Sequence, residues 1–237
     1  MKYLDLTLET PAENLACDEA LLDFCEETGG PEVLRIWEPT EYFVVLGYAN
    51  KVDLEVNSGA CREKKVPILR RCSGGGTVLQ GPGSINYSLI LNWEDNGRLQ
   101  TITQANQFIM GRHRDLLKPY LNSSVSIEGH TDLVIGERKF SGNAQRRKKK
   151  FLLFHGTFLL DFKLELIEQL LCMPSKEPCY REGRTHLDFL MNLHQPALEL
   201  KRILKSGWNA VENLSYIPDF SRLVNEKYGL AEWNFKF

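Results

Sequence analysis

The stretch RRCSGGGTVLQGPG, residues 70–83, is the densest glycine run of the chain and says most about its fold. Glycines lack a Cβ, so a ligand can approach their backbone closely and their amides can face an anion. The two arginines at its start, Arg70 and Arg71, could pair with a phosphate or a carboxylate. The stretch has neither the G-K-[ST] ending of a P-loop nor the G-x-G-x-x-G spacing of a dinucleotide site. Spacing alone is equally consistent with a glycine-rich turn that carries two exposed arginines.

Upstream of this stretch, the sequence predicts one helix and several short strands. Thr10 can cap a helix, Pro11 suits its first position, and Glu13 completes a capping box. The pair Gly29-Gly30 is a stop signal for that helix. Runs rich in β-branched and aromatic residues, bounded by Gly, Pro or Asn, indicate strands at 34–37, 43–46, 67–70 and 87–91.

Downstream, helical and strand-like patterns are mixed. A helical period with Ile102 and Ile109 on its apolar stripe covers about 101–121, and a hairpin joins 132–135 to 138–141. We expect a strand region at 151–160, broken at 155–157, and helices at 164–171, 197–204 and 220–228. Without strict β-α-β alternation, this order favours an α+β (mixed α/β) fold. We expect a single catalytic domain over 1–237, with 196–237 as a small helical appendage and no large C-terminal accessory domain.

Composition excludes several classes of protein. The chain has 237 residues, 43% of them apolar, and a net charge of -2, which suits a globular protein and argues against a dedicated nucleic-acid binder. No run approaches the roughly 18 apolar residues of a membrane span, and the acidic N-terminus is not an export signal. The six cysteines include no C-x-x-C pair, so we expect no metal site, mostly buried thiols and a cytoplasmic location.

Three further segments contain candidate chemistry. Lys139 falls in a strand-like run just before Ser141-Gly142, where it could face a phosphate or simply be solvated. His155-Gly156-Thr157 combines an imidazole with a glycine that permits close approach, although a single histidine is most often structural. The basic run 146–150 is either a solvated loop or a mobile loop that closes over an anionic ligand.

Taken together, three ordered motifs resemble one known family. The patterns R-R-x-S-G-G-G-x-V, T-D-L-V-x(3)-R-K-x-S-G-N-A and H-G-T-x-L-L-D have the order and spacing of the lipoate-protein ligase A family. That family is a branch of the biotin/lipoate A/B protein ligase superfamily, which includes octanoyltransferases. The resemblance covers residues 1–195 and implies a class II synthetase-like α/β catalytic domain.

The resemblance implies an acyl-adenylate chemistry. Ligases of this family bind lipoate or octanoate and ATP with Mg²⁺, form an acyl-AMP, and pass the acyl group to a lysine of a carrier domain. Lys139 would be the catalytic residue, contacting the acyl carbonyl and the α-phosphate, and the run 146–150 would lie in the loop over the adenylate. The substrate- and nucleotide-binding residues implied by similarity are Arg71, Ser73, Gly74, Gly75, Gly76, Thr77, Val78, Asp132, Ser141, Gly142, Asn143, Ala144, His155, Gly156 and Thr157.

The resemblance also implies partners. The acceptor would be an acidic apo lipoyl carrier domain or an H-protein-like protein, and a small accessory subunit would be a further partner. No nucleic acid and no membrane is expected. Arg181, Arg184 and His186 could form a basic rim that speeds encounter with an acidic carrier, or belong to an exposed helix start.

The sequence departs from the ligase pattern in places and leaves alternatives open. Gln80 stands where many ligases carry His, Thr131 stands where Asn is frequent, and few residues follow the shared core. One alternative is a cysteine-dependent octanoyl or lipoyl transferase that takes the acyl group from a carrier thioester, with Cys172 or Cys179 as nucleophile. Another is a non-catalytic protein that binds the carrier domain.

Overall fold

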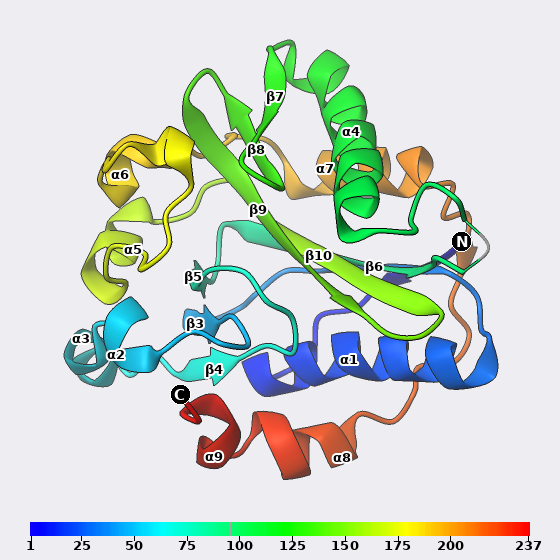
Figure 1. Ribbon diagram of the computed structural model, residues 1–237, viewed down its shortest axis with the longest axis horizontal. Coiled ribbons are helices and arrows are strands. Elements are labelled where there is room, and N and C mark those ends of the chain that lie inside the picture. The colour runs from blue at the N-terminus through cyan, green and yellow to red at the C-terminus, as the bar shows by residue number, and fades with distance from the viewer. Residues whose placement is uncertain (95) are drawn as a thin grey trace.

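The computed structural model describes residues 1–94 and 96–237, which are organised around one large mixed sheet (Figure 1). Within those residues its strand order is β11-β1-β2-β6-β10-β9-β8-β7. Strand β1 is parallel to β11 and β2, and the remaining neighbours are antiparallel. The strands of this sheet are β1 (Lys2–Asp5), β2 (Val33–Trp37), β6 (Ser84–Asn92), β7 (Val125–Glu128), β8 (Asp132–Ile135), β9 (Arg138–Arg147), β10 (Phe151–Leu159) and β11 (Glu212–Asn213).

A smaller sheet and a set of helices complete the molecule. The small sheet has the order β4-β3-β5, formed by β3 (Phe43–Leu46), β4 (Ile68–Arg70) and β5 (Val78–Gln80). The helical elements are α1 (Pro11–Thr28), α2 (Val52–Glu55), α3 (Ser58–Glu63), α4 (Ile102–Leu121), α5 (Leu164–Leu170), the 3-10 turn η1 (Cys179–Arg181), α6 (His186–Phe189), α7 (Ala197–Gly207), α8 (Ser221–Leu223), the π-helical turn η2 (Val224–Tyr228) and α9 (Ala231–Asn234). This is the mixed α/β class that the sequence predicts.

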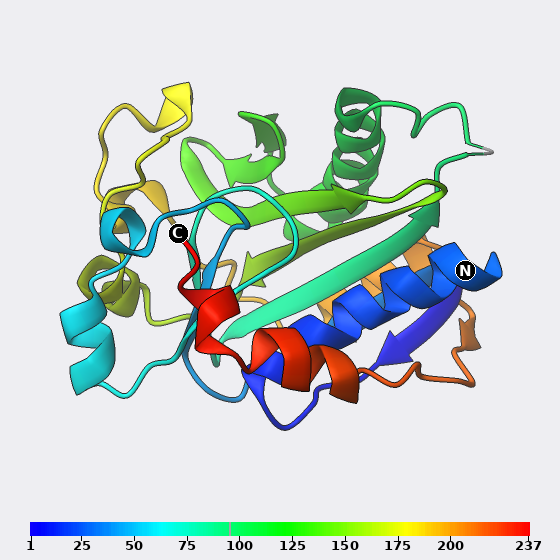
Figure 2. The same ribbon diagram turned by 60° about the horizontal axis from the view of Figure 1, so that its bottom comes forward.

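Helices cover both faces of the large sheet, so its central strands are buried (Figure 2). On one face, Ile109 of α4 and Leu204 of α7 pack with Phe158 of β10. On the other face, Leu21 of α1 packs with Leu153 of β10. Burying apolar side chains at about 25 cal/mol per Å² is the main stabilising contribution to such layers.

Helix α1 has the ends that its sequence predicts. The Thr10 side chain accepts a hydrogen bond from the Glu13 amide, and Glu13 returns one to the Thr10 amide, so the capping box is present. Gly29 ends the helix in the left-handed conformation, with φ of 65°. Helix α1 lies against β6 and β10, and Asp18 is on its buried face.

Several expected elements are longer or differently placed in the structure. The region 151–160 is not broken at His155: β10 runs without interruption because both of its neighbours, β6 and β9, pair with it throughout that stretch. Strand β9 extends beyond Ser141 to Arg147. In α4, Ile102 is exposed rather than on the buried stripe, since it is the first residue of the helix.

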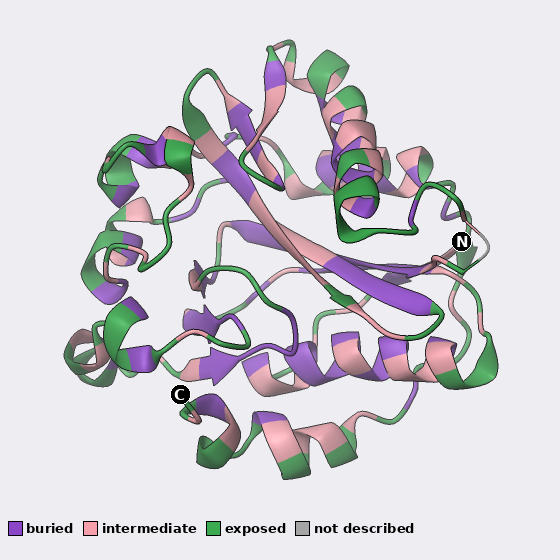
Figure 3. Cartoon of the chain, viewed as in Figure 1, coloured by how far each residue is buried: buried purple, intermediate pink, exposed green. Residues whose placement is uncertain are grey.

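Exposure is unevenly distributed over the molecule (Figure 3). The long strands β6 and β10 are largely buried, whereas the lobe formed by α2, α3, α5 and α6 carries many exposed residues. The segment after α7 crosses to the opposite face, where η2 packs against α1 and α9 packs against β4. It therefore contacts the strand that leads into the glycine-rich stretch.

Candidate functional site

Arg71 lies inside the glycine ribbon, which we define as residues 73–76. Its guanidinium donates to the carbonyls of Gly74 at 2.6 Å and Gly76 at 2.8 Å, and its Nε donates to Ser73 Oγ at 3.0 Å. Gly75 has a φ of 87°, and a Cβ there would lie 2.9 Å from the guanidinium. The ribbon is thus wrapped around a buried cation. Burial lowers the pKa of this guanidinium to about 10. The expected contact of Arg71 with an anion stays a prediction.

Arg70 does not face a ligand, contrary to both sequence-based interpretations of the arginine pair. It is fully buried, and its side chain donates to the carbonyls of Gly47, Tyr48 and Asn50 on one side and of Asn234 on the other. A guanidinium has five donors in a rigid fork, which suits such a cluster of carbonyls. Arg70 therefore ties the C-terminal segment to the loop beside the ribbon.

The outer side of the ribbon is open. A Cβ at Gly74 or Gly76 would meet nothing within 4 Å, so the backbone there is accessible to a ligand. Next to it, the buried Oγ1 of Thr77 has no hydrogen-bond partner among the described residues. It is one of eight such buried atoms among the described residues, and it follows the ribbon directly in the chain, where a ligand oxygen could bond to it. Val78 begins β5 directly after it.

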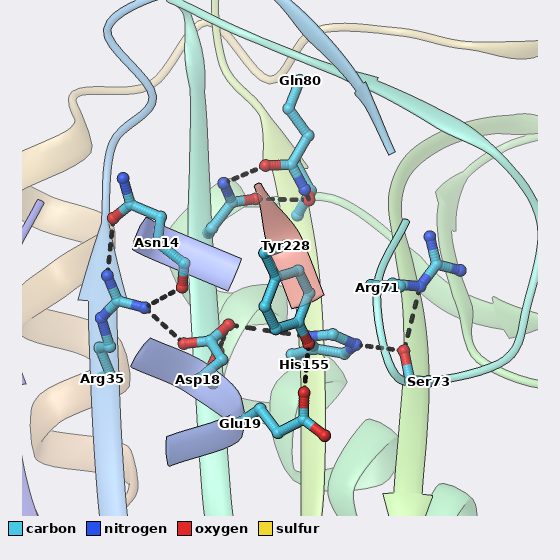
Figure 4. Close-up of polar contacts among 12 residues, drawn as sticks. Asn14, Asp18, Glu19, Arg35, Arg71, Ser73, Gln80, His155 and Tyr228 are labelled. Carbon is cyan, nitrogen blue, oxygen red and sulfur yellow. Dashed lines mark hydrogen bonds and ion pairs between the residues drawn. The ribbon is translucent and has the colours of Figure 1, made fainter. Parts of the chain in front are cut away.

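A chain of buried polar contacts reaches the ribbon from α1 and β2 (Figure 4). Arg35 donates to Asp18 at 2.6 Å, and the other Asp18 oxygen lies 3.7 Å from His155 Nδ1. His155 Nε2 is 2.6 Å from Ser73 Oγ. Burial by itself would raise the pKa of Asp18, but Arg35, together with the nearby His155 ring and the hydrogen bond from Ser88, holds it below its ordinary value. A buried carboxylate is stable only when paired in this way.

The sequence did not single out Asp18 or Arg35 as site residues. A signal was present for Arg35, the one charged residue of the otherwise apolar strand β2, but not for Asp18, which is one of six acidic residues in α1. Charged residues are rarely fully buried unless they are paired.

Lys139 pairs with Asp132 across the β8–β9 hairpin. The Nζ–Oδ1 distance is 2.8 Å, and both side chains are mostly buried. The second carboxylate oxygen accepts a hydrogen bond from the Tyr180 hydroxyl at 2.7 Å. Burial, followed by the nearby Asp132 charge, raises the pKa of Tyr180, so this hydroxyl remains a donor. Sequence reasoning assigned no role to Tyr180.

A β-bulge directs Lys139 toward the glycine ribbon. Leu133 pairs with Ser141 and Val134 pairs with Lys139, which leaves Phe140 as an extra residue in β9. A Cβ at Gly142 would lie 2.9 Å from Lys139 Nζ, so this glycine leaves space for the ammonium group. A Cβ at Gly75 would lie 3.4 Å from that of Ala144. Because Gly142 and Ala144 alternate onto one face of β9, Lys139 and the ribbon share that face.

Asn143, on the opposite face of β9, is held by several hydrogen bonds. Its Oδ1 accepts from the Tyr87 hydroxyl and its Nδ2 donates to the carbonyl of Thr131. Asn143 Oδ1 occupies the space where a Cβ of Gly156 would be, at 1.7 Å. This explains why β10 carries a glycine at that position.

A separate ring of side chains lies between β5, β6 and β10. Thr157 donates to Asn86, Asn86 donates to Gln80, and Gln80 donates back to Thr157. Gln80, which replaces the histidine frequent in ligases, is therefore bonded within the protein. Ser141 is also buried, with 1% of its surface exposed.

The two candidate nucleophiles lie apart from the glycine ribbon in sequence and in contacts. Cys172 is half-buried, and its amide and carbonyl are bonded to Glu55 and His186. Cys179 is exposed, one residue before Tyr180. The other four cysteines are buried, as expected, and burial raises their pKa values, to about 11 for Cys17 and about 12 for Cys25 and Cys72.

The basic run 146–150 forms the end of β9 and the turn that leads into β10. Arg146 and Arg147 end β9, Lys148 pairs with Asp23 at 2.6 Å, and the amides of the following turn donate to Glu26 at the end of α1. Of this run, Arg146 is exposed and alternates onto the same face of β9 as Ala144. It is therefore the cation of the run that lies next to the ribbon side of the sheet.

The expected basic rim is not present either. Arg181 is buried and lies over the Phe189 ring, at 4.8 Å from its centroid, and Arg184 donates to the carbonyls of Glu137 and Tyr180. His186 is buried as well. These side chains brace the segment that carries Tyr180, because their donors are needed to satisfy its backbone carbonyls.

In the part of the chain that comprises residues 1–94 and 96–237, no group of three His, Cys, Asp or Glu side chains is arranged to hold a metal ion. Its helices are all too short or too polar to cross a bilayer.

Comparison with known proteins identifies relatives of this arrangement. Octanoyltransferases LipM of Bacillus subtilis and Brevibacillus brevis are each 28% identical to the chain, over 99% of it and 98% of their own length. A T. acidophilum protein described as a lipoate protein ligase, solved with bound lipoic acid, superimposes with a TM-score of 0.81 at 21% identity, over all of both chains. A lipoate-protein ligase A bound with ATP superimposes with a TM-score of 0.78 at 23% identity, over 99% of each chain.

A family model gives the same result from sequence alone. The model of the lipoyl protein ligase A/B catalytic domain matches residues 10–203, a range that includes the ribbon, Lys139, His155 and the Asp18–Arg35 pair. Since that range is most of the chain, and the fold is the one seen in lipoate ligases, this protein belongs to the lipoyl protein ligase A/B catalytic domain family.

Proposed function

We propose that the chain transfers an octanoyl group from a carrier thioester to a lysine of an apo lipoyl domain. The curated octanoyltransferases that it resembles over nearly their whole length support this reading over the ATP-dependent one. A lipoyl domain as acceptor is also consistent with an archaeal lipoate ligase of the same fold, which was solved with its E2 lipoyl domain.

The observation that carries the proposal is the position of the Lys139 ammonium group. It lies on the face of β9 shared with the open glycine ribbon, with the space beside it left free by Gly142. Acyl transfer passes through a tetrahedral intermediate whose oxygen is negative, and a cation held near that oxygen lowers the barrier. The Asp132 carboxylate holds the ammonium in place until the acyl carbonyl arrives.

The transfer itself forms an amide and releases a thiol. The acceptor amine attacks the thioester carbonyl, the C–N bond forms, the C–S bond breaks, and the carrier sulfur leaves with the proton that the amine loses. In a two-step version, an enzyme thiolate first displaces the carrier thiol and the amine then displaces the enzyme thiol. Cys179 is the better candidate for that thiol, because its neighbour Tyr180 is bonded to Asp132.

A second candidate function is ATP-dependent lipoate ligation. It is favoured by the positions of the cysteines, since no thiol of residues 1–94 and 96–237 is hydrogen-bonded to Lys139, Asp132 or the ribbon. The unpaired Thr77 hydroxyl beside the ribbon would suit a nucleotide oxygen. Mg²⁺ would then enter with the triphosphate, and Asp132 is the carboxylate nearest to Lys139 that could meet it.

The test is a pair of transfer assays on purified protein with an apo lipoyl domain. One assay supplies octanoyl-carrier protein without ATP, and the other supplies octanoate or lipoate with ATP and Mg²⁺; the mass of the lipoyl domain is measured. Modification in the first assay supports the thioester reaction, and modification only in the second supports the ligase. A lipoyl domain that stays unmodified in both assays but binds the chain would indicate the non-catalytic alternative.

Lys139→Ala should lower the rate of whichever transfer occurs by about 10²-fold or more. The matched control is Lys118→Ala, which removes an exposed lysine of α4. Near-wild-type turnover of the Lys139 variant would remove this residue from the reaction. Cys179→Ser and Cys172→Ser, tested in the same assay, show whether an enzyme thiol takes part.

A further inference from the structure

The buried contacts of Asp18, His155 and Ser73 have no task in the transfer described above. They connect a charge pair in the core to the first residue of the glycine ribbon (Figure 4). Asp18 and Ser73 have 3% and 0% of their surface exposed. A buried polar network costs free energy unless each of its members has a hydrogen-bond partner, so we ask what function this network serves.

The hydrogen-bond partners determine where the protons lie. Ser73 Oγ accepts from Arg71 Nε at 3.0 Å and lies 2.6 Å from His155 Nε2. The Asp18 carboxylate can only accept, and its Oδ2 lies 3.7 Å from His155 Nδ1, which assigns the ring proton to Nδ1 and leaves Nε2 to accept from the Ser73 hydroxyl. Ser88 donates to the same Asp18 oxygen at 2.7 Å, and this fixes the carboxylate.

The ribbon depends on Ser73 because it has little else to hold its outer residues. Gly74 and Gly76 have open space where a side chain would be, and three consecutive glycines are conformationally free. The Ser73 carbonyl accepts from the Tyr48 amide at 2.8 Å, and the carbonyls of Gly74 and Gly76 accept from Arg71, whose Nε is also bonded to Ser73 Oγ. Fixing the Ser73 hydroxyl therefore fixes the guanidinium around which the ribbon is wrapped.

We propose that Asp18 and His155 are positioning residues that hold Ser73, and through it the glycine ribbon, in the shape that receives the acyl donor. The inference rests on the proposed function for its substrate but not for its geometry. A Ser-His-Asp set could also form an acyl-serine, but Ser73 is completely buried, so an acyl carbonyl has no access to its oxygen.

Two isosteric variants separate positioning by His155 from a mere packing role. In His155→Gln the amide oxygen falls near the place of Nε2 and can still accept from Ser73. In His155→Asn the amide falls near the place of Nδ1, and the acceptor for Ser73 is lost. We expect the Gln variant to keep kcat/KM for the acyl donor within about threefold of wild type. The Asn variant should lose roughly 10- to 100-fold, as for a buried hydroxyl left without its acceptor.

The matched control is His194→Asn, which makes the same change at an exposed histidine paired with Asp161. We expect no change in transfer for this variant. Ser73→Ala should reproduce the loss of His155→Asn, and the double variant should lose no more than either single one, because both remove one interaction. Equal loss in the Gln and Asn variants, or additive losses in the double variant, would overturn the proposal. Acyl-Ser73 detected by mass spectrometry would overturn it as well.

A second readout does not depend on activity. Hydrogen exchange of the Tyr48 amide, which donates to the Ser73 carbonyl at 2.8 Å, should be faster in His155→Asn than in wild type, with the strands of the large sheet unchanged, and should stay slow in His155→Gln. Unaltered exchange of this amide in the Asn variant would contradict the positioning role. Since exchange needs no substrate, a wild-type chain inactive with both acyl sources would contradict only the proposed function.

Discussion

Asp132 uses its two carboxylate oxygens for two different donors, the Lys139 ammonium and the Tyr180 hydroxyl. A carboxylate that accepts a second hydrogen bond holds its first partner less strongly, because its charge is shared between them. In the transfer that we propose, Tyr180 would therefore lower the cost of moving Lys139 from Asp132 to the acyl carbonyl. The same hydroxyl would keep Asp132 in place after the ammonium has moved.

Tyr180→Phe should lower kcat for acyl transfer by roughly 5- to 10-fold, corresponding to one hydrogen bond to a charged group. KM should change less, because the ribbon is not touched. Steady-state kinetics with the acyl donor in excess would measure both constants. Tyr216→Phe, at an exposed tyrosine, is the control and should behave as wild type. An unchanged kcat in the Tyr180 variant would separate this residue from the reaction.

His113 makes the stability of the protein sensitive to acid. The side chain is fully buried between α4 and the sheet, its Nε2 accepts from the Trp208 indole at 2.9 Å, and burial lowers its pKa to about 3. In the unfolded chain the pKa returns to about 6.5, so below that pH the unfolded state binds a proton that the folded state does not. Stability is therefore complete above pH 6.5 and falls as the pH falls toward 3.

At pH 5 this single group should cost about 2 kcal/mol relative to pH 7. Urea unfolding at the two pH values measures the difference. His113→Gln keeps an acceptor for Trp208 but does not titrate, so the loss between pH 7 and pH 5 should shrink by about that amount. The same acid loss in the variant and in wild type would show that other groups are responsible.

At the scale of elements, β9 and β10 illustrate how two strands are adapted to the site. The bulge at Phe140 redirects Lys139, and Gly156 leaves room for the Asn143 side chain. A bulge and an internal glycine both interrupt the alternation of apolar and polar residues by which a strand is recognised in a sequence. This is why the sequence predicts a break at His155 where the structure has a continuous strand.

Gly156→Ala should destabilise the protein by about 1–3 kcal/mol, because its Cβ would overlap Asn143 Oδ1, which Tyr87 and Thr131 hold in place. The matched change is Gly111→Ala in the interior of α4, where a Cβ meets nothing within 4 Å. That variant should gain about 0.5–1 kcal/mol from helix propensity. Urea unfolding of the two variants should therefore show shifts of opposite sign.

At the scale of the whole molecule, the C-terminal segment is joined to the site through Arg70. Asn234 accepts from the Arg70 amide at 2.9 Å, and its own carbonyl accepts from the Arg70 guanidinium. The same guanidinium holds the carbonyls of residues 47, 48 and 50, beside the ribbon. Arg70 therefore connects the last helix to the loop that supports the glycine ribbon.

Asn234→Ala should cost about 1–3 kcal/mol, since it leaves the buried Arg70 amide without an acceptor. Asn225→Ala, at an exposed position of η2, should change stability by less than about 0.5 kcal/mol. The urea midpoints of both variants measure these two changes in stability. A midpoint equal to wild type for the Asn234 variant would show that water replaces the lost acceptor.

The sequence by itself determined the features that are encoded over a few neighbouring residues. The limits of α1 follow from Thr10, Glu13 and Gly29, and the β8–β9 hairpin follows from its turn at Gly136. The family, and the ribbon and Lys139 as parts of a candidate site, follow from three ordered motifs. Capping, glycine conformation and residue alternation are local effects, so they can be recognised in the sequence without knowledge of the fold.

Only the tertiary structure decided what each polar group faces. Ser73 and His155 are 82 positions apart, and Ser88 and Asp18 are 70 apart, yet each pair is hydrogen-bonded. The same holds for Arg70, whose neighbours in the chain suggest a ligand, whereas it donates to the carbonyls of Trp233 and Asn234, more than 160 positions away in the C-terminal segment. Burial and pairing of a charge depend on which distant segments the packing brings together, and no local pattern contains that information.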